Sequence, residues 1–147
     1  MNHRGVKAPL GEIMDRTALY AALDSFLAAM NARDHTRVDW APGVHNSENN
    51  VMLAPGDGVW GTLLKLGDYQ LKFADVKTRQ VGYFGTVIEA IEESAFTLRL
   101  VFDEAQRVAE CEMLIVRQSD SGIKFENCRY WDKDRKSTRL NSSHTDI

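Results

Sequence analysis

Apolar and polar residues alternate along three consecutive stretches in the second half of the chain, residues 81–91, 95–102 and 107–117. Successive side chains of a β-strand point to opposite faces, so a period of two predicts half-buried strands. The short polar stretches between them, residues 92–94 and 103–106, are typical of hairpin loops. The pattern therefore predicts an antiparallel meander.

The register of the last two predicted strands follows if Phe102 faces Arg107, which sets Arg99 directly opposite Glu110. A one-residue slip would bury these charges, so the identity of the buried face is well specified. That apolar face carries Phe96, Leu98, Leu100, Phe102, Ala109, Cys111, Met113 and Ile115.

An amphipathic helix is predicted from Arg16 to about Ala32, with Asp15 as its N-cap. Its apolar stripe consists of Leu19, Leu23, Phe26, Leu27 and Met30. We expect less regular pieces elsewhere: a turn or short helix at 33–42, a strand near 50–53, a turn at 55–58, helix or strand at 63–74, and a last strand at 123–131. A helix followed by an antiparallel meander predicts an α+β domain with helices on one face of the sheet.

The composition of the 147-residue chain suits one domain and narrows its partners. The sequence has no basic patch, no apolar run long enough for a membrane span and no signal-peptide core. Its two cysteines, Cys111 and Cys128, form neither a disulfide framework nor a zinc-ligand spacing, and Cys111 fits a small buried residue. We expect a cytoplasmic protein with no nucleic-acid and no membrane partner.

The end of the chain has a different character. Residues 134–144 read DRKSTRLNSSH, which is the translation of a common sequencing-library adapter, with a genuine polar tail as the alternative. We expect residues 134–147 to derive from the adapter, residues 15–133 to form the domain and residues 1–14 to be an irregular extension. The natural protein would then continue past Lys133, and removing the three basic and two acidic residues of the tail changes the net charge from −3 to −4.

Residues 42–85 set polar and aromatic side chains among glycine turns, just ahead of the predicted meander. Ligand pockets usually combine apolar walls with a few orienting polar groups. This segment therefore predicts a pocket for a small hydrophobic molecule. The prediction rests on His45, Glu48, Asn49, Asn50, Trp60, Asp68, Tyr69 and Tyr83.

A series of short motifs lies within residues 15–117: ARD at 32–34, WAP at 40–42, ENN at 48–50, GDGVWGT at 56–62, GDY at 67–69, FAD at 73–75 and VGYFG at 81–85. Together with the last predicted strand they resemble one subgroup of the nuclear transport factor 2-like (SnoaL-like) superfamily. Polyketide cyclases, ketosteroid isomerase and scytalone dehydratase share its cone-shaped fold. The resemblance implies a curved antiparallel sheet around a deep pocket that the N-terminal helices close.

The same resemblance implies chemistry without a cofactor, namely dehydration, cyclisation, isomerisation or aldol-type cleavage. Some bacterial relatives act on lignin-derived aromatic diols and release formaldehyde. A similar second half often follows the first in this subgroup. The resemblance therefore also implies pairing with a missing C-terminal half, and a homodimer through the outer face of the sheet is the alternative expectation.

Glu48 leads the candidates for a general acid or base, because desolvation in an apolar pocket makes a carboxyl usable near neutral pH. A turn carboxylate that caps backbone N–H groups is the equal alternative. Asp34 and Asp39 follow the first helix, and His45 is of a type that shuttles protons, with capping or solvated roles as alternatives. If residues 44–50 are extended, His45 and Glu48 point to opposite faces.

Tyr69 and Tyr83 are candidates for polarising a developing oxyanion, with packing as the alternative. Asn49 would assist them, and the aromatic residues that would contact a ligand ring are Trp40, Trp60 and Phe84. The ion pair of Arg99 and Glu110 fits either pocket machinery or an exposed cross-strand pair. The sequence lacks dinucleotide, phosphate-loop, zinc-protease and nucleophile-elbow motifs, so we expect no cofactor and no metal.

These features favour a cofactor-independent lyase or isomerase that acts on a small hydrophobic, aromatic molecule by general acid/base catalysis. A non-catalytic module with the same pocket is one alternative. An interaction domain that uses the outer face of the sheet is another, because a fold of this kind supports several functions.

Overall fold

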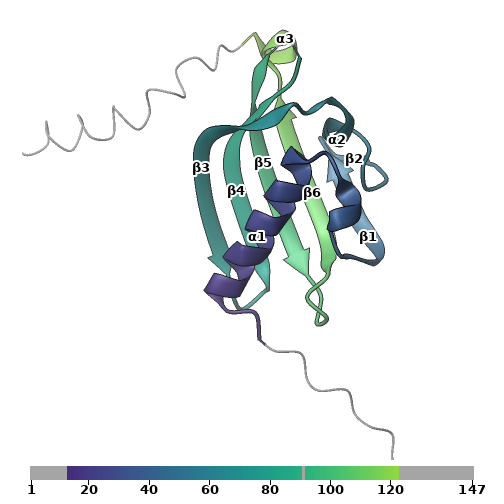
Figure 1. Cartoon of the computed structure of the whole chain (residues 1–147), viewed down its shortest axis with the longest axis vertical. Helices are drawn as coiled ribbons and strands as arrows, with labels where there is room; N and C mark the ends of the chain where they lie inside the picture. Colours follow the sequence, from purple (N-terminus) through teal and green to yellow (C-terminus); the bar gives the residue numbers. More distant parts are fainter. Residues whose placement is uncertain (1–12, 91, 123–147) are drawn as a thin grey trace, which may run out of the picture.

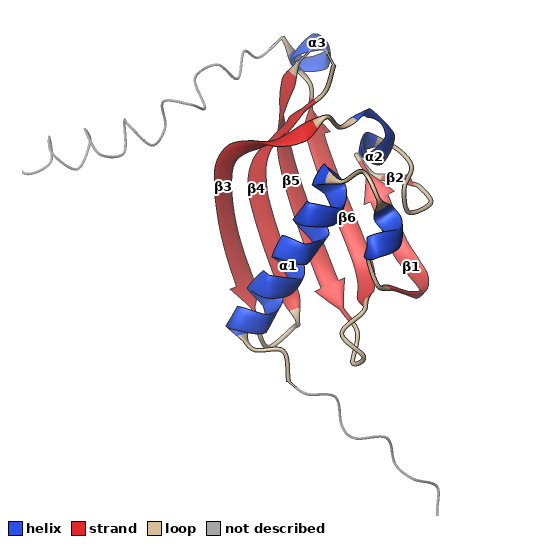
Figure 2. Cartoon of the chain, in the orientation of Figure 1, coloured by secondary structure: helices blue, strands red, loops and turns tan. Residues whose placement is uncertain are grey.

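The computed structural model describes residues 13–90 and 92–122 of the chain. One long helix, several short helical pieces and a six-stranded sheet make up this part (Figures 1 and 2). The elements are α1 (Arg16–Asn31), η1 (His35–Arg37), β1 (Trp40–Glu48), β2 (Val51–Met52), α2 (Val59–Thr62), β3 (Lys65–Asp75), β4 (Gln80–Ile88), β5 (Glu93–Phe102), β6 (Val108–Val116) and α3 (Gln118–Ser121). The last strand expected at 123–131 and the adapter-like tail lie outside the described residues.

The six strands form one curved sheet in the order β2-β1-β6-β5-β4-β3. Neighbouring strands are antiparallel except β1 and β6, which are parallel. Period-two alternation predicts strands but not their partners, so the parallel pair is a feature that the sequence pattern did not contain. The expected α+β class, with α1 on one face of the sheet, is confirmed (Figure 2).

Helix α1 lies diagonally across one face of the sheet (Figure 1). It begins where predicted, because the Asp15 carboxylate accepts a hydrogen bond of 2.8 Å from the Ala18 N–H and satisfies a free donor of the first turn. The predicted apolar stripe is buried along its whole length: Leu19, Leu23, Phe26, Leu27 and Met30. None of the helices in the described part of the chain combines the length and the apolar character needed to cross a membrane.

The β5–β6 hairpin keeps the predicted faces but not the predicted register. Arg99 pairs with Glu112 and Val101 with Glu110, so the expectation that Arg99 faces Glu110 is wrong by two residues. The reason is the turn, in which the Asp103 carboxylate accepts the N–H of Ala105 and of Arg107 and delays pairing until Val108. A shift by two residues returns a side chain to its original face, which is why most of the predicted set is buried: Phe96, Leu98, Leu100, Phe102, Cys111, Met113 and Ile115. The register shift between Val101 and Phe102 changes the face at the start of β6, so that Val108 is buried in place of the predicted Ala109.

Asn49 holds the end of β1 against β6. Its φ is +49°, and its side-chain amide replaces a backbone partner: Nδ2 donates to Ile115 O at 3.1 Å, and Ile115 N–H donates to Oδ1 at 2.8 Å. Its backbone N–H donates to Met113 O at 2.9 Å. Asn49 therefore extends the parallel pair past the last residue of β1.

We predict that Asn49→Gly lowers the free energy of unfolding by about 1–3 kcal/mol, because two hydrogen bonds to β6 are lost while the positive φ is retained. Asn49→Ala should lose a further ~1 kcal/mol from the backbone conformation. Urea unfolding monitored by circular dichroism measures both. A glycine variant as stable as the parent would show that the amide does not secure β6.

Candidate functional site

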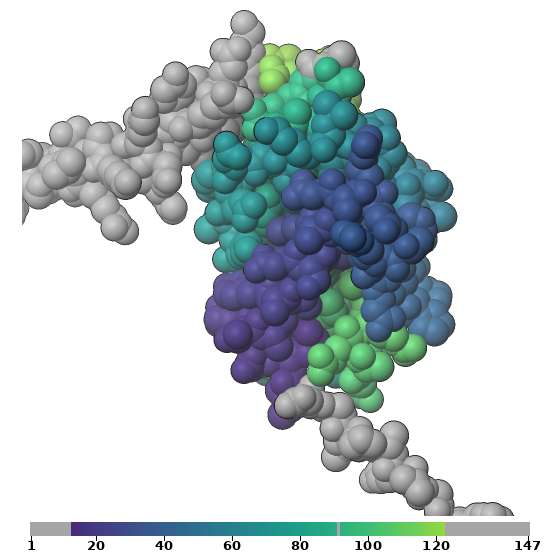
Figure 3. Space-filling view, in the orientation of Figure 1, coloured from purple at the N-terminus to yellow at the C-terminus, as the bar shows by residue number. Residues whose placement is uncertain are grey.

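The space between α1 and the sheet is filled mainly by apolar side chains. Figure 3 views the molecule from the α1 side and shows α1 and the residues after it packed over the sheet. Four buried polar side-chain atoms have no hydrogen-bond partner among the described residues. They are Asn46 Oδ1, Trp60 Nε1, Tyr83 OH and Ser94 Oγ. Buried polar atoms are nearly always paired, so four exceptions in one small domain require an explanation.

The Tyr83 hydroxyl is the most enclosed of these groups. Tyr83 lies on the inner face of β4 with no exposed surface, and its ring packs against Phe96 at a centroid distance of 5.9 Å. The hydroxyl extends over Gly85, where a Cβ atom would lie 2.3 Å from it. Burial raises the pKa of Tyr83 to about 12, so the hydroxyl is neutral at physiological pH and retains its proton. Ser94 is on the same face of β5, two residues before Phe96.

Trp60 belongs to an aromatic cluster where α1 and α2 meet. Its ring lies edge-on to Phe26 at 5.5 Å, to Trp40 at 6.4 Å and to His35 at 6.4 Å. The Trp40 indole N–H donates to the backbone oxygen of His35 at 2.9 Å, whereas the Trp60 indole N–H has no partner within residues 13–90 and 92–122. The indole N–H of Trp40 is therefore satisfied within the fold, whereas no described residue accepts the indole N–H of Trp60.

The polar residues at the end of β1 contact mainly the backbone. One Glu48 oxygen accepts the Val59 N–H at 2.7 Å at the start of α2, and the other lies 3.8 Å from Arg117 Nη2. Asn49 contacts β6 as described above, and Asn50, with a φ of +64°, forms the turn to β2. His45 is exposed and Glu48 is half-buried. Glu48, Asn49 and Asn50 thus build the connection between β1, β2 and α2.

The remaining candidates are dispersed. Asp34 caps η1, and hydrogen bonds from the Thr36 side chain and backbone hold its pKa below the ordinary value. Asp39 is exposed, and Tyr69 is half-buried on β3 where the register with β4 shifts. Phe84 lies on the opposite face of β4 from its neighbour Tyr83 and is 46% exposed. Of the candidates from the sequence, Tyr83 and Trp60 alone present an unpartnered buried polar atom among the described residues.

A buried ion pair that the sequence pattern did not reveal lies beside α2. Arg117 donates to both oxygens of Glu89, from Nε at 2.7 Å and from Nη2 at 2.9 Å, and the Thr62 hydroxyl donates to Glu89 as well. Glu89 is only 8% exposed. These hydrogen bonds, chiefly the one from Arg117, hold the pKa of Glu89 below its ordinary value. The local sequence does not distinguish Glu89 from the neighbouring Glu92 and Glu93.

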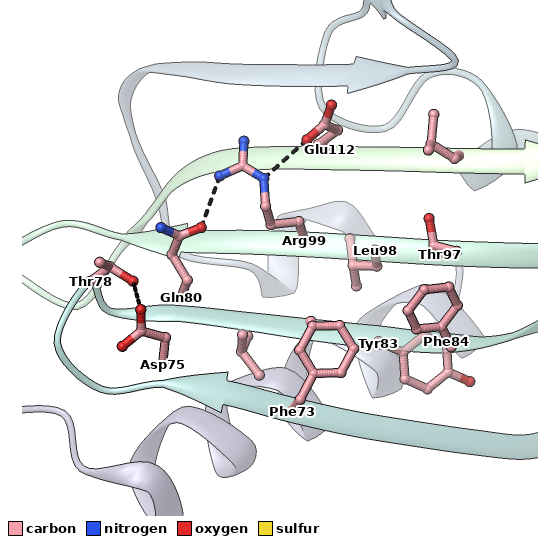
Figure 4. Close-up of a pocket in the computed structure, with 13 residues that line it drawn as sticks. Phe73, Asp75, Thr78, Gln80, Tyr83, Phe84, Thr97, Leu98, Arg99 and Glu112 are labelled. Carbon is pink, nitrogen blue, oxygen red and sulfur yellow. Dashed lines mark hydrogen bonds and ion pairs between the residues drawn. The ribbon is translucent and has the colours of Figure 1, made fainter.

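Two further features bear on cofactors and ligands. The described residues contain no group of three or more His, Cys, Asp or Glu side chains arranged to hold a metal ion. On the face of the sheet opposite α1, residues of β3 to β6 form an open groove of about 350 Å³ (Figure 4).

Cys111 is fully buried, as predicted, and burial raises the pKa of its thiol to about 12, so it is an inert packing residue.

No protein-family model and no curated protein sequence matches the chain. Solved structures match its fold. A protein of unknown function with a cystatin-like fold from Methylobium petroleophilum has a TM-score of 0.59 at 12% identity, over 82% of this chain and 93% of that one. A steroid delta-isomerase from Pseudomonas aeruginosa has a TM-score of 0.52 at 17% identity, over 77% and 86%. A protein from Sphaerobacter thermophilus has a TM-score of 0.53 at 12% identity, over 71% and 98%. The chain has the expected nuclear transport factor 2-like fold, and identities this low show the fold alone.

We predict that Glu89→Gln lowers the free energy of unfolding by about 1.5–3 kcal/mol at pH 7, because charged hydrogen bonds to Arg117 are weakened. A carboxyl with a lowered pKa in the folded state stabilises the protein above its unfolded pKa and loses that contribution as the pH falls through the folded pKa. The difference between parent and variant should therefore shrink below about pH 4.5, the ordinary glutamate value. Urea unfolding at several pH values measures this.

Glu110→Gln is the matched control, since Glu110 also pairs with an arginine but is far more exposed and should contribute less than about 1 kcal/mol. A difference between parent and Glu89→Gln that stays constant down to pH 3.5 would contradict the assignment.

Proposed function

We propose that the protein binds a small, mainly apolar molecule with hydrogen-bonding oxygens in the interior between α1 and the sheet, where the apolar side chains that fill this space repack around it. The observation that carries this proposal is the set of four buried polar atoms without partners, Asn46 Oδ1, Trp60 Nε1, Tyr83 OH and Ser94 Oγ. An unpaired buried polar atom costs about 1–3 kcal/mol of stability, so each of these groups calls for a partner that the described residues do not supply, such as a ligand or an ordered water.

The chemistry of these atoms suggests the class of ligand. The Trp60 indole only donates, Asn46 Oδ1 only accepts, and the Tyr83 and Ser94 hydroxyls do both. A ligand that reaches both a donor and an acceptor of this set carries at least one acceptor oxygen and one donor on an apolar body, as a phenol or a hydroxylated ketone does. Apolar walls with a few fixed polar groups are the usual composition of a small-molecule site. The fold likeness to a steroid delta-isomerase supports including steroid ketones among the compounds tested.

A second candidate is cofactor-independent catalysis of a lyase or isomerase reaction on such a molecule. It is supported by the neutral, desolvated Tyr83 hydroxyl, since a preorganised donor in apolar surroundings stabilises a developing oxyanion. Glu48 is the proposed proton carrier. It would have to exchange its hydrogen bond with the Val59 N–H for one with a substrate.

We predict that Tyr83→Phe weakens binding of a phenol or a steroid ketone about three- to tenfold, the effect of one hydrogen bond. The same variant should be at least as stable as the parent without ligand, because it removes an unpaired buried hydroxyl. Calorimetric titration and thermal unfolding measure the two effects. Tyr20→Phe is the matched control, since the Tyr20 hydroxyl is directed at the backbone oxygen of Lys72. A Tyr83→Phe variant that loses stability and keeps its affinity would show that the hydroxyl serves the fold.

For the catalytic candidate we predict that Glu48→Gln abolishes turnover while binding changes little, because glutamine still accepts the Val59 N–H but does not carry the proton. Mass spectrometry of mixtures with phenolic diols and ketones detects loss of water, loss of formaldehyde or isomerisation. Glu104→Gln, in the exposed β5–β6 turn, is the control. Unchanged turnover would remove Glu48 from the mechanism.

A further inference from the structure

The outer face of the sheet carries a groove that the interior site does not use. It lies across β3 to β6, on the side opposite α1, with Gly82 in its floor and a volume of about 350 Å³ (Figure 4). That volume is within the range of small-molecule sites. Because successive side chains of a strand alternate, Phe84 faces this groove while Tyr83 faces the interior. Tyr83 is among the residues that line the groove, but its side chain has no exposed surface and its hydroxyl lies against Gly85, so the groove is a site distinct from the interior hydroxyl.

Two phenylalanine rings form the apolar wall of the groove. Phe73 and Phe84 are 49% and 46% exposed, and their rings lie 5.8 Å apart with planes inclined at 38°. The ring of Phe73 lies over Gly82, where a Cβ atom would approach it to 2.1 Å, so the glycine fixes the position of the ring. Leu114 continues the apolar surface across Thr97, which pairs with both Phe84 and Leu114.

The opposite side of the groove is polar and acidic. Arg99 donates to Glu112 at 3.0 Å and to Gln80 at 3.2 Å (Figure 4). It also donates to Glu110 at 2.9 Å, so one guanidinium is held between two carboxylates. Asp75 also lines the groove, and hydrogen bonds from Thr78 and the Lys77 backbone hold its pKa below the ordinary value. The group has three carboxylates, Asp75, Glu110 and Glu112, against the guanidinium of Arg99 and the ammonium of Lys77, which acts on Asp75, so one negative charge remains in excess.

We propose that this groove binds a small organic cation with a flat apolar body, such as a protonated aromatic amine. The rings of Phe73 and Phe84 offer their negative faces to a cation and an apolar surface to its body. The surplus of carboxylates on the polar side attracts a positive charge. An anionic ligand would meet the same carboxylates with like charge.

The charge distribution also argues against a second copy of the chain as the occupant. Two such faces in contact would bring Asp75, Glu110 and Glu112 of each copy together, with Arg99 and Lys77 of each copy to offset them. Like charges facing one another across an interface weaken it and select against that partner.

The test titrates the full chain by calorimetry with three probes of similar size: 2-phenylethylammonium, 2-phenylethanol and 3-phenylpropanoate. We expect the cation to bind about fivefold or more tightly than the neutral alcohol, with the anion weakest, and the preference to diminish as salt is added. Equal binding of the cation and the anion, or no binding of the cation at millimolar concentration, would overturn the proposal.

Matched variants locate the binding. Phe84→Ser should weaken the affinity for the cation about fivefold. Val116→Ser removes a similarly exposed apolar side chain that does not line the groove, and it should change the affinity less than about twofold. Glu112→Gln should reduce the preference for the cation over the alcohol, and Glu104→Gln should not. Ser94→Ala, at an interior residue that does not line the groove, should leave cation binding unchanged, which separates this site from the interior one. Cation binding that is insensitive to both Phe84→Ser and Glu112→Gln would place the ligand elsewhere and contradict the proposal.

Discussion

The packing of α1 against the inner face of the sheet is the contact on which the rest of the molecule depends. Leu19, Leu23 and Met30 lose all their exposed surface there, and full burial of each such side chain is worth about 1.5–3 kcal/mol. This contact decides which side of each strand is inside. The alternation along β4 then sends Tyr83 to the interior and Phe84 to the outer face. Both proposed sites are thus consequences of one choice of buried face.

The polar residues at the end of β1 resemble catalytic residues in the sequence, but in the structure they satisfy backbone N–H groups. Glu48 and Asn49 both direct side-chain oxygens at backbone N–H groups, of Val59 and Ile115 respectively. A parallel pair that ends beside a short helix leaves such donors unsatisfied, and side chains of this type supply the missing acceptors. The interior atoms of Trp60 and Tyr83 differ from them in having no partner within the described residues, which is why they support a ligand site better.

The features that the sequence predicted are those that depend on the spacing of residues within a single helix or strand. The N-cap at Asp15, the apolar stripe of α1 and the faces of β5 and β6 all follow from spacing within one element. The parallel pairing of β1 with β6 joins segments about 65 residues apart, and no local period encodes it. The Glu89–Arg117 pair was not predicted for the same reason, since its two residues are 28 positions apart in the sequence. Ser94 was missed because the predicted strand began one residue after it, and boundaries are the least certain part of a pattern.

The central claim, that the interior keeps polar groups for a ligand, is tested most directly by the two described indole N–H groups in a ¹H–¹⁵N spectrum. Trp40 already donates to His35 and serves as an internal reference, whereas Trp60 has no partner. Assignment by Trp40→Phe and Trp60→Phe followed by titration with a phenol or a steroid ketone gives the answer. If the ligand accepts a hydrogen bond from Trp60, its indole signal shifts downfield and saturates, while the Trp40 signal moves little. A Trp60 signal that stays in place while the compound binds would contradict it.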